Sequence, residues 1–238
     1  MRLSKYLRNI VRFFGIDLVR FSSTADNRRA KLLQHFDIDL IIDVGANSGQ
    51  YAKSSRADMG YKGRIISFEP ISEVFIDLER ISKNDKNWDA FNFALGDVNG
   101  SETINISKNS HSSSLLSMLD SHLRAAPQSL YIGSEIIEIK TLDSVFKDLC
   151  SENKNIFLKI DTQGYESRVL RGAENILNSI NTIQLEMSLV PLYEGELIFI
   201  DMCHYLYEQG YTLIGLESGF GDQVSGQLLQ VDGIFHRF

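Results

Sequence analysis

The chain has few of the features that mark secreted, membrane-spanning or metal-binding proteins. Its only cysteines, Cys150 and Cys203, have neither zinc-type nor redox-type spacing. No apolar run approaches the roughly 20 residues of a membrane-spanning helix, and charges interrupt every apolar stretch near the basic N-terminus, so no secretory signal is evident. No cluster of His, Asp and Glu has metal-type spacing, although dispersed carboxylates could still assemble a Mg²⁺ site. We therefore expect a cytoplasmic protein with buried thiols, and we assign no residue as a metal ligand.

Positive charge is scarce outside the N-terminal segment. The formal net charge is −7; residues 1–31 carry eight Lys or Arg against two Asp or Glu, so the rest of the chain carries −13. Binding to nucleic acid needs a basic surface, and this acidic body argues against it. The length of 238 residues and the 43% hydrophobic content are typical of one soluble globular domain.

The two common phosphate-binding loops are also missing. Residues 39–44 form a short apolar run typical of a buried parallel strand, and Gly45 and Gly49 bracket the turn that follows. A dinucleotide fingerprint would place a glycine where Asn47 stands, and a phosphate loop would place a lysine after Gly49. With Asp43 before the turn, the pattern favours a ligand that carries a cationic amino acid part.

Strands and helices alternate from Phe36 onward, which predicts βαβ units around a mostly parallel sheet. The last two strands have no helix between them, so we expect an antiparallel pair at one edge. Residues 97–100 have hairpin-turn chemistry, and the serine-rich residues 109–127 are expected to form a loop with some helix. Strands are predicted at residues 39–44, 64–69, 88–95, 102–107, 135–140, 156–161, 182–187, 211–216 and 229–236, with helices at about 50–59, 72–83, 142–149, 165–177 and 197–208.

The N-terminal segment differs from the rest. Residues 2–14 predict an amphipathic helix with an apolar and a basic face. Such a helix could pack on the domain or mediate self-association, and it could also lie on the inner surface of a membrane as a peripheral contact. We therefore divide the chain into a basic helical extension, residues 1–35, and one domain, residues 36–238.

Ligands of open α/β sheets bind beyond the carboxyl ends of the strands, and acidic residues gather at these positions. Glu69 follows Gly49 by 20 residues, a suitable place for an acid that binds two ribose hydroxyls, and Pro70 stops its strand. The turn at residues 94–97 could flank an adenine or be a simple β-turn. Each acid alone could be a helix cap, but four together predict a site: Asp43, Glu69, Asp161 and Glu186.

Six short motifs follow one another in the order seen in a known family. They are Asp43-Val44-Gly45-Ala46-Asn47-Ser48-Gly49, Ser67-Phe68-Glu69-Pro70, Ala94-Leu95-Gly96-Asp97, Thr141-Leu142-Asp143, Lys159-Ile160-Asp161-Thr162-Gln163-Gly164-Tyr165-Glu166 and Gln230-Val231-Asp232-Gly233-Ile234-Phe235. The combination resembles the FkbM family of S-adenosylmethionine-dependent methyltransferases from about Phe36 to the C-terminus. The resemblance does not cover the first 35 residues, so it gives the basic helix no role.

The resemblance implies a class I methyltransferase fold, a Rossmann-like, mostly parallel seven-stranded sheet with helices on both faces and its last strand antiparallel. It also implies S-adenosylmethionine as cofactor, with Asp43 near the amino group, Glu69 on the ribose and the turn at residues 94–97 beside the adenine. The family position of Gln163 is often an acid, so no base is expected there. The cofactor-binding set is Asp43, Gly45, Ala46, Asn47, Gly49, Glu69, Pro70, Ala94, Leu95, Gly96 and Asp97.

Methyl transfer to a hydroxyl calls for a positioned base. The candidates are Asp161 and Glu186 at strand ends and His111 in the serine-rich loop. The family implies O-methylation of a saccharide or a related small-molecule acceptor. Two alternatives stay open: a noncatalytic scaffold that binds the cofactor, and a nicotinamide-dependent oxidoreductase, against which Asn47 counts.

Overall fold

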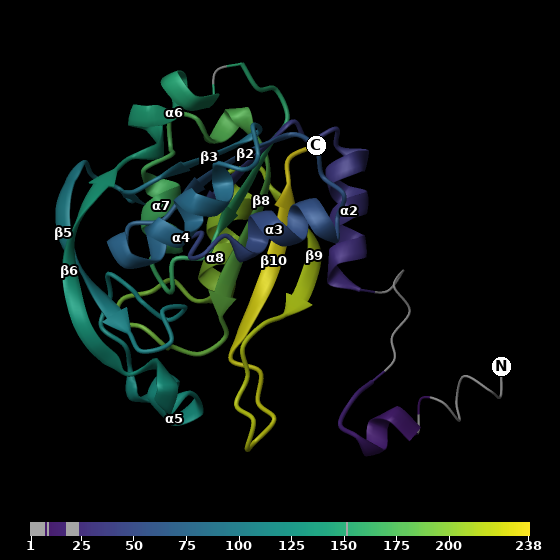
Figure 1. Ribbon diagram of the computed structural model, residues 1–238, viewed down its shortest axis with the longest axis vertical. Helices are drawn as coiled ribbons and strands as arrows, with labels where there is room; N and C mark the ends of the chain where they lie inside the picture. The colour runs from purple at the N-terminus through teal and green to yellow at the C-terminus, as the bar shows by residue number, and fades with distance from the viewer. Residues whose placement is uncertain (1–7, 9, 18–23, 151) are drawn as a thin grey trace.

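The centre of the protein is a seven-stranded sheet, seen in a computed structural model that describes residues 8, 10–17, 24–150 and 152–238 (Figure 1). Its strand order is β3-β2-β1-β7-β8-β10-β9. The strands from β3 to β8 in this order are paired in parallel, whereas β10 is antiparallel to both β8 and β9. The strands are β1 (Leu40–Val44), β2 (Arg64–Phe68), β3 (Trp88–Phe91), β7 (Ile156–Ile160), β8 (Ile180–Ser188), β9 (Thr212–Ser218) and β10 (Gln230–His236).

This topology confirms the fold expected from the sequence. The sheet has seven strands, the final strand is the antiparallel one, and β9 forms the edge beside it. The order reverses at β1, where chain connections lead to β2 on one side and β7 lies on the other. In open α/β sheets a ligand site forms outside the carboxyl ends of strands at such a reversal. The fold is that of a class I methyltransferase.

Helices cover both faces of the sheet because the strand residues alternate between two cores. In β1, Ile41 packs in the core that contains Leu33 of α2 and Ala52 of α3. Ile42 packs in the opposite core with Leu206 of α8. The helices of the first face are α2 (Ala25–His35), α3 (Gln50–Ala57) and α4 (Ser72–Ser82), and those of the second are α6 (Leu142–Cys150), α7 (Glu166–Arg171) and α8 (Phe199–Glu208).

A separate three-stranded sheet, β4-β6-β5, lies beside the main one (Figure 1). Its strands are β4 (Ala94–Leu95), β5 (Gly100–Ser107) and β6 (Tyr131–Lys140). The prediction of one strand over residues 88–95 was wrong, because the chain leaves the main sheet after β3. The side-chain amide of Asn92 donates to the carbonyl oxygens of Glu69 and Pro70, both at 2.9 Å, and fixes this change of direction.

Two further expectations need correction. Residues 97–100 do not close a hairpin, because β6 lies between β4 and β5 in the small sheet. The helix expected over residues 165–177 ends at Arg171 in α7, where Gly172 approaches Gly96 so closely that a Cβ would lie 1.8 Å from its carbonyl oxygen. The serine-rich segment is a loop with some helix, as expected: α5 spans Asp120–Ala125 and is followed by the short helix Pro127–Ser129.

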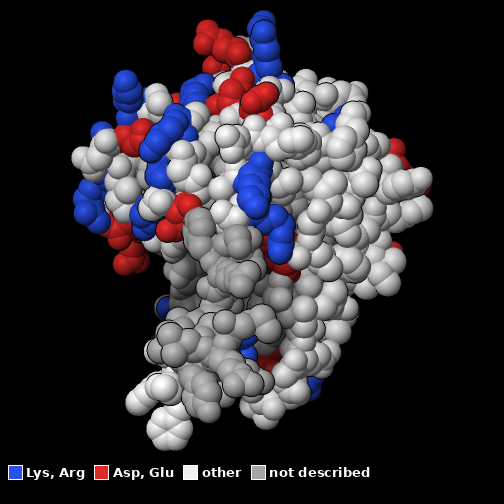
Figure 2. Space-filling view, turned by 90° about the vertical axis from the view of Figure 1, so that its right-hand side faces the viewer, with Lys and Arg blue, Asp and Glu red and all other residues white. Residues whose placement is uncertain are grey.

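The helix expected at residues 2–14 falls largely outside the described residues. Residues 10–13 are helical, and Phe13 and Phe14 are exposed. The next helix, α2, is joined to β9 because Arg28 and Arg29 both pair with the buried carboxylate of Glu217. Figure 2 shows this side of the molecule, where basic and acidic side chains are mixed over the upper part. The membrane contact and self-association of residues 1–14 stay predictions.

Among the residues that the structure describes, no helix is both long and apolar enough to cross a membrane.

Candidate active site

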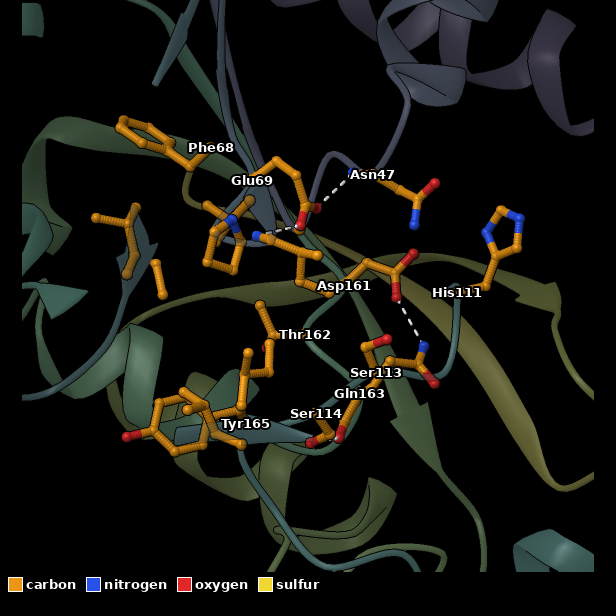
Figure 3. A pocket seen from close by; sticks show the side chains of 18 of the residues that line it. Asn47, Phe68, Glu69, His111, Ser113, Ser114, Asp161, Thr162, Gln163 and Tyr165 are labelled. Atoms are coloured by element: carbon orange, nitrogen blue, oxygen red, sulfur yellow. Dashed lines mark hydrogen bonds between the residues drawn. The ribbon is translucent and has the colours of Figure 1, made fainter. Parts of the chain in front are cut away.

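A cavity of about 250 Å³ opens where β1, β2, β7 and β8 end and the small sheet begins. Figure 3 shows Glu69 and Asn47 on one side of it and Ser113, Ser114 and Gln163 on the other, with Asp161 between them. It lies at the carboxyl ends of the strands, where the sheet order reverses. Its lining residues are Val44, Gly45, Asn47, Phe68, Glu69, Pro70, Ile71, Ala94, Leu95, Ile104, Ser110, His111, Ser113, Ser114, Leu115, Asp161, Thr162, Gln163, Tyr165 and Glu186.

The turn after β1 approaches the end of β7 at a distance that only glycine allows. Gly45 has φ +71°, and a Cβ there would lie 1.9 Å from the carbonyl oxygen of Asp161. Asn47 also has a positive φ, and its side-chain oxygen accepts a hydrogen bond from the Ser48 N–H at 2.8 Å. The turn is thus folded tightly against the residue that the sequence singled out as a candidate base.

We expect Gly45→Ala to distort the site, and Gly60→Ala is its matched control. Gly60 has nearly the same φ, +68°, but no atom lies within 4 Å of the place that an alanine methyl group would occupy there. Both substitutions place alanine in the left-handed region, which costs about 1–2 kcal/mol; only Gly45→Ala adds the clash with Asp161. Chemical unfolding should show a larger loss of stability for Gly45→Ala, and equal losses would contradict the close approach.

Glu69 is buried at the end of β2, where the backbone holds its carboxylate. Its Oε2 accepts from the Asn47 N–H at 2.8 Å, and its Oε1 accepts from the Ile71 N–H at 2.9 Å. Burial raises the pKa of Glu69 to about 7, although these two backbone hydrogen bonds act in the opposite direction. The carboxylate is therefore fixed in position, and its protonation changes close to neutral pH.

Asp161 and Glu186 lie on either side of the Gln163 amide. The amide Nε2 donates to Asp161 Oδ1 at 2.9 Å and to Glu186 Oε2 at 2.8 Å. Its oxygen accepts from the hydroxyl of Tyr193 at 2.8 Å, and that contact sets the orientation of the amide. The departure from the family pattern at Gln163 thus places a donor between two carboxylates.

The two carboxylates differ in their surroundings. Asp161 Oδ2 lies 3.5 Å from the ammonium of Lys159. Glu186 has no cation at that distance among the described residues; Gln230 donates a second hydrogen bond to its Oε2 at 2.9 Å. Burial and, next, the charge of Asp161 raise the pKa of Glu186 well above its usual value. Groups whose environments differ in this way can divide acid–base roles.

One wall of the cavity is apolar and could receive a flat ring. It is formed by Phe68 at the end of β2, Leu95 in β4 and the ring of Tyr165. Figure 3 shows Phe68 and Tyr165 well apart along it. Ile71, Ala94, Ile104 and Leu115 form a continuous part of this wall from the main sheet to the small sheet. The cavity therefore joins an apolar half to a half that carries carboxylates and hydroxyls.

The serine-rich loop is tied to the site. Asn47 Nδ2 donates to Ser110 Oγ at 3.2 Å, and Ser114 Oγ donates to the Gln163 carbonyl oxygen at 2.7 Å. His111 lies between these two contacts in the chain, is exposed, and lines the edge of the cavity (Figure 3). All three candidate bases, Asp161, Glu186 and His111, thus line one cavity.

The proposed cofactor residues divide into two groups. Gly45, Asn47, Glu69, Pro70, Ala94 and Leu95 line the cavity. The other five do not. Three of them make backbone or packing contacts: Ala46 donates its N–H to the Phe68 carbonyl, Gly49 packs on Trp88, and Gly96 lies against Gly172. The two acids form ion pairs, Asp97 with Arg168 at 2.7 Å and Asp43 with Lys159 at 3.1 Å.

Sequence reasoning gave no role in the site to Lys159, Tyr193 or Gln230, although Lys159 and Gln230 stand in two of the motifs. Lys159 stands in an otherwise apolar buried strand, and that charge was a usable signal. Tyr193 and Gln230 reach the site through tertiary contacts, and no local pattern indicates which residues they meet there. Within the described part of the chain, no group of three or more His, Cys, Asp and Glu side chains could hold a metal ion.

Comparisons with known proteins agree with this fold. The model of the methyltransferase FkbM domain matches residues 43–213. Methyltransferase FkbM from Methylobacillus flagellatus KT superposes with a TM-score of 0.54 at 13% identity, over 83% of this chain and 44% of that one, so this chain spans less than half of that protein's length. No curated protein matches the sequence.

Two other solved structures have lower similarity. TehB from Haemophilus influenzae gives a TM-score of 0.47 at 9% identity, over 92% of this chain and 66% of that one. Fibrillarin from Aeropyrum pernix, solved with natively bound S-adenosyl-L-methionine, gives a TM-score of 0.46 at 13% identity, over 87% of this chain and 74% of that one. The identification rests on the family model, which matches well over half of the chain: this protein belongs to the FkbM family of methyltransferases.

Proposed function

We propose that this protein uses S-adenosylmethionine to methylate a hydroxyl group of a saccharide or a related metabolite. The family supports methyl transfer. The observation that carries the finer proposal is that one cavity holds Glu69 near its apolar wall and Asp161 and Glu186 on its polar side. The cofactor, when bound, supplies a methyl group activated on a cationic sulfur.

The residues of the cavity fit such a cofactor. Glu69, anchored by two backbone N–H groups, would accept hydrogen bonds from the ribose hydroxyls. The wall around Phe68 and Leu95 would pack against the adenine, and the turn at Gly45 and Asn47 would hold the amino acid part. The lining residues include acids but no Lys or Arg, so the charge around the cavity suits a cationic ligand.

Glu186 is the residue that we assign as general base. Both of its hydrogen bonds from described residues reach Oε2, so Oε1 is free to accept a proton from an acceptor hydroxyl. The raised pKa of Glu186 makes its carboxylate a stronger base than an ordinary glutamate. Asp161, with one oxygen accepting from Gln163 and the other near Lys159, would help to hold the amide in place.

The test is methyl transfer from S-adenosylmethionine labelled with ¹³C at the methyl carbon, offered with neutral sugars and with aminated sugars. NMR should show the label as an O-methyl group of a product. Label on a nitrogen atom of the product would contradict O-methylation. If no acceptor becomes labelled although the protein binds the cofactor, the noncatalytic scaffold is favoured. Adding nucleosides and oligosaccharides to the tested compounds narrows the class of molecule that serves as acceptor.

Affinity for S-adenosylhomocysteine should depend on pH. Only ionised Glu69 can accept from two hydroxyls, and its pKa is about 7. As the pH falls below that value the protonated fraction rises, so affinity should fall about tenfold between roughly pH 8 and pH 6. Calorimetric titration at both pH values checks this, with Glu69→Gln as the control that should lose the dependence. Equal affinities in the wild type would contradict the role of Glu69.

A further inference from the structure

Asp43 belongs to a polar row that crosses the main sheet. Strand register places Asp43 of β1 between Ser67 of β2 and Lys159 of β7, and Lys159 is beside Gln184 of β8. The row lies on the sheet face that α3 covers, where the Tyr51 hydroxyl of α3 donates to the Gln184 side chain at 3.1 Å. The side chain of Asp43 therefore lies within this row, between the sheet and α3, and Asp43 does not line the cavity.

Lys159 connects this row to the site. Its ammonium lies 3.1 Å from Asp43 Oδ1, 3.5 Å from Asp161 Oδ2 and 3.4 Å from the carbonyl oxygen of Gly45. The side chain of Lys159 is 9% exposed and that of Asp43 is fully buried, while the ring of Tyr51 covers the ammonium at 5.5 Å. One buried cation thus contacts both the turn after β1 and the end of β7.

We propose that Asp43 acts on the cofactor site through Lys159 and does not contact the ligand itself. In this arrangement Lys159 is a positioning residue that joins the Gly45 turn to Asp161, and Asp43 is its counter-ion. The inference rests on the proposed function, since the ligand it concerns is the cofactor. It changes the role that the sequence suggested for Asp43, an acid beside the amino group of that cofactor.

The physical argument concerns buried charge. Removing one partner of a buried ion pair leaves the other without compensation, which is costly, whereas removing both is often tolerated. Asp43→Asn would leave Lys159 with a weaker set of acceptors and would release it from its position between Gly45 and Asp161. Once Lys159 is absent, Asp43 has no cation to hold, so its replacement should have no further cost to ligand binding.

A double-variant cycle tests this directly. Asp43→Asn, Lys159→Met and the double variant are titrated with S-adenosylhomocysteine, with thermal unfolding to establish the folded fraction of each. Lys53→Met on the exposed side of α3 is the control for loss of a positive charge. We expect each single substitution to weaken binding by about tenfold or more, because each disrupts a buried charge pair. The double variant should bind no more weakly than Lys159→Met and should be more stable than either single variant.

Three outcomes are distinguishable. If Asp43→Asn weakens binding by the same factor with Lys159 present and absent, Asp43 contacts the ligand and the inference is overturned. If Asp43→Asn alone does not fold, the folded double variant decides: binding equal to that of Lys159→Met supports the inference, and weaker binding contradicts it. Wild-type protein that does not bind S-adenosylhomocysteine would contradict the proposed function itself; the inference about this ligand would fall with it.

Discussion

Replacing Glu69 with alanine should weaken the binding of S-adenosylhomocysteine by about 100-fold, because two charge-assisted hydrogen bonds to the ribose are lost together. The carboxylate is held by the N–H groups of Asn47 and Ile71, so it meets the ligand without having to be reoriented. Interactions that are already organised in this way contribute more to binding than mobile ones. Isothermal titration calorimetry measures the effect.

The control for this substitution is Glu73→Ala. Glu73 is an exposed acid in the first turn of α4, close to Glu69 in the chain but absent from the cavity wall. Its replacement removes the same charge and should leave the affinity within about twofold of wild type, as expected for a surface position. Similar losses in both variants would show that net charge, and not contact with the ribose, determines the affinity.

Glu186→Gln should reduce the rate of methyl transfer by a factor between about 10² and 10⁴, the usual contribution of a general base. The substituted amide can still occupy the space and meet its neighbours, but it cannot take the hydroxyl proton at Oε1. Affinity for S-adenosylhomocysteine should change little, because the cofactor's ribose is assigned to Glu69 on another strand. Single-turnover assays with a labelled methyl donor separate the two effects.

The matched control is Glu194→Gln, an exposed glutamate in the loop that follows β8. It should retain the wild-type rate. If Glu186→Gln also retains that rate while Asp161→Asn or His111→Ala loses it, the base is one of the other two candidates, which line the same cavity. In wild type the rate should rise with pH through the raised pKa of Glu186, since the ionised form is the active base.

The main sheet could be predicted because its signals are local. Buried strands such as β1 and β7 are short apolar runs, and the alternation with helices determines that they pair in parallel. The absence of a helix between β9 and β10 correctly predicted the antiparallel pair. By contrast, the small sheet depends on pairing between β5 and β6, which are separated by the serine-rich segment. Such pairing leaves no local pattern.

In the candidate site, too, some positions follow from local sequence signals and others depend on how the strands pair. Glu69 and Asp161 directly follow strands and Glu186 lies near the end of β8, so their positions at one sheet edge could be derived from the sequence. Asp43 has a similar place in the sequence, but its side chain falls on the sheet face covered by α3, where Lys159 is its register neighbour. Which neighbour a buried acid meets depends on strand register between β1 and β7, and one sequence does not specify that.

The most direct measurement is calorimetric titration of the wild-type protein with S-adenosylmethionine, S-adenosylhomocysteine and NAD. The cavity has one fixed carboxylate for a ribose, an apolar wall, acids on its polar side, and no Lys or Arg among its lining residues. We predict saturable binding of both sulfur compounds and no binding of NAD, whose pyrophosphate would find no cation there. Binding of NAD alone, or of none of the three, would contradict the account.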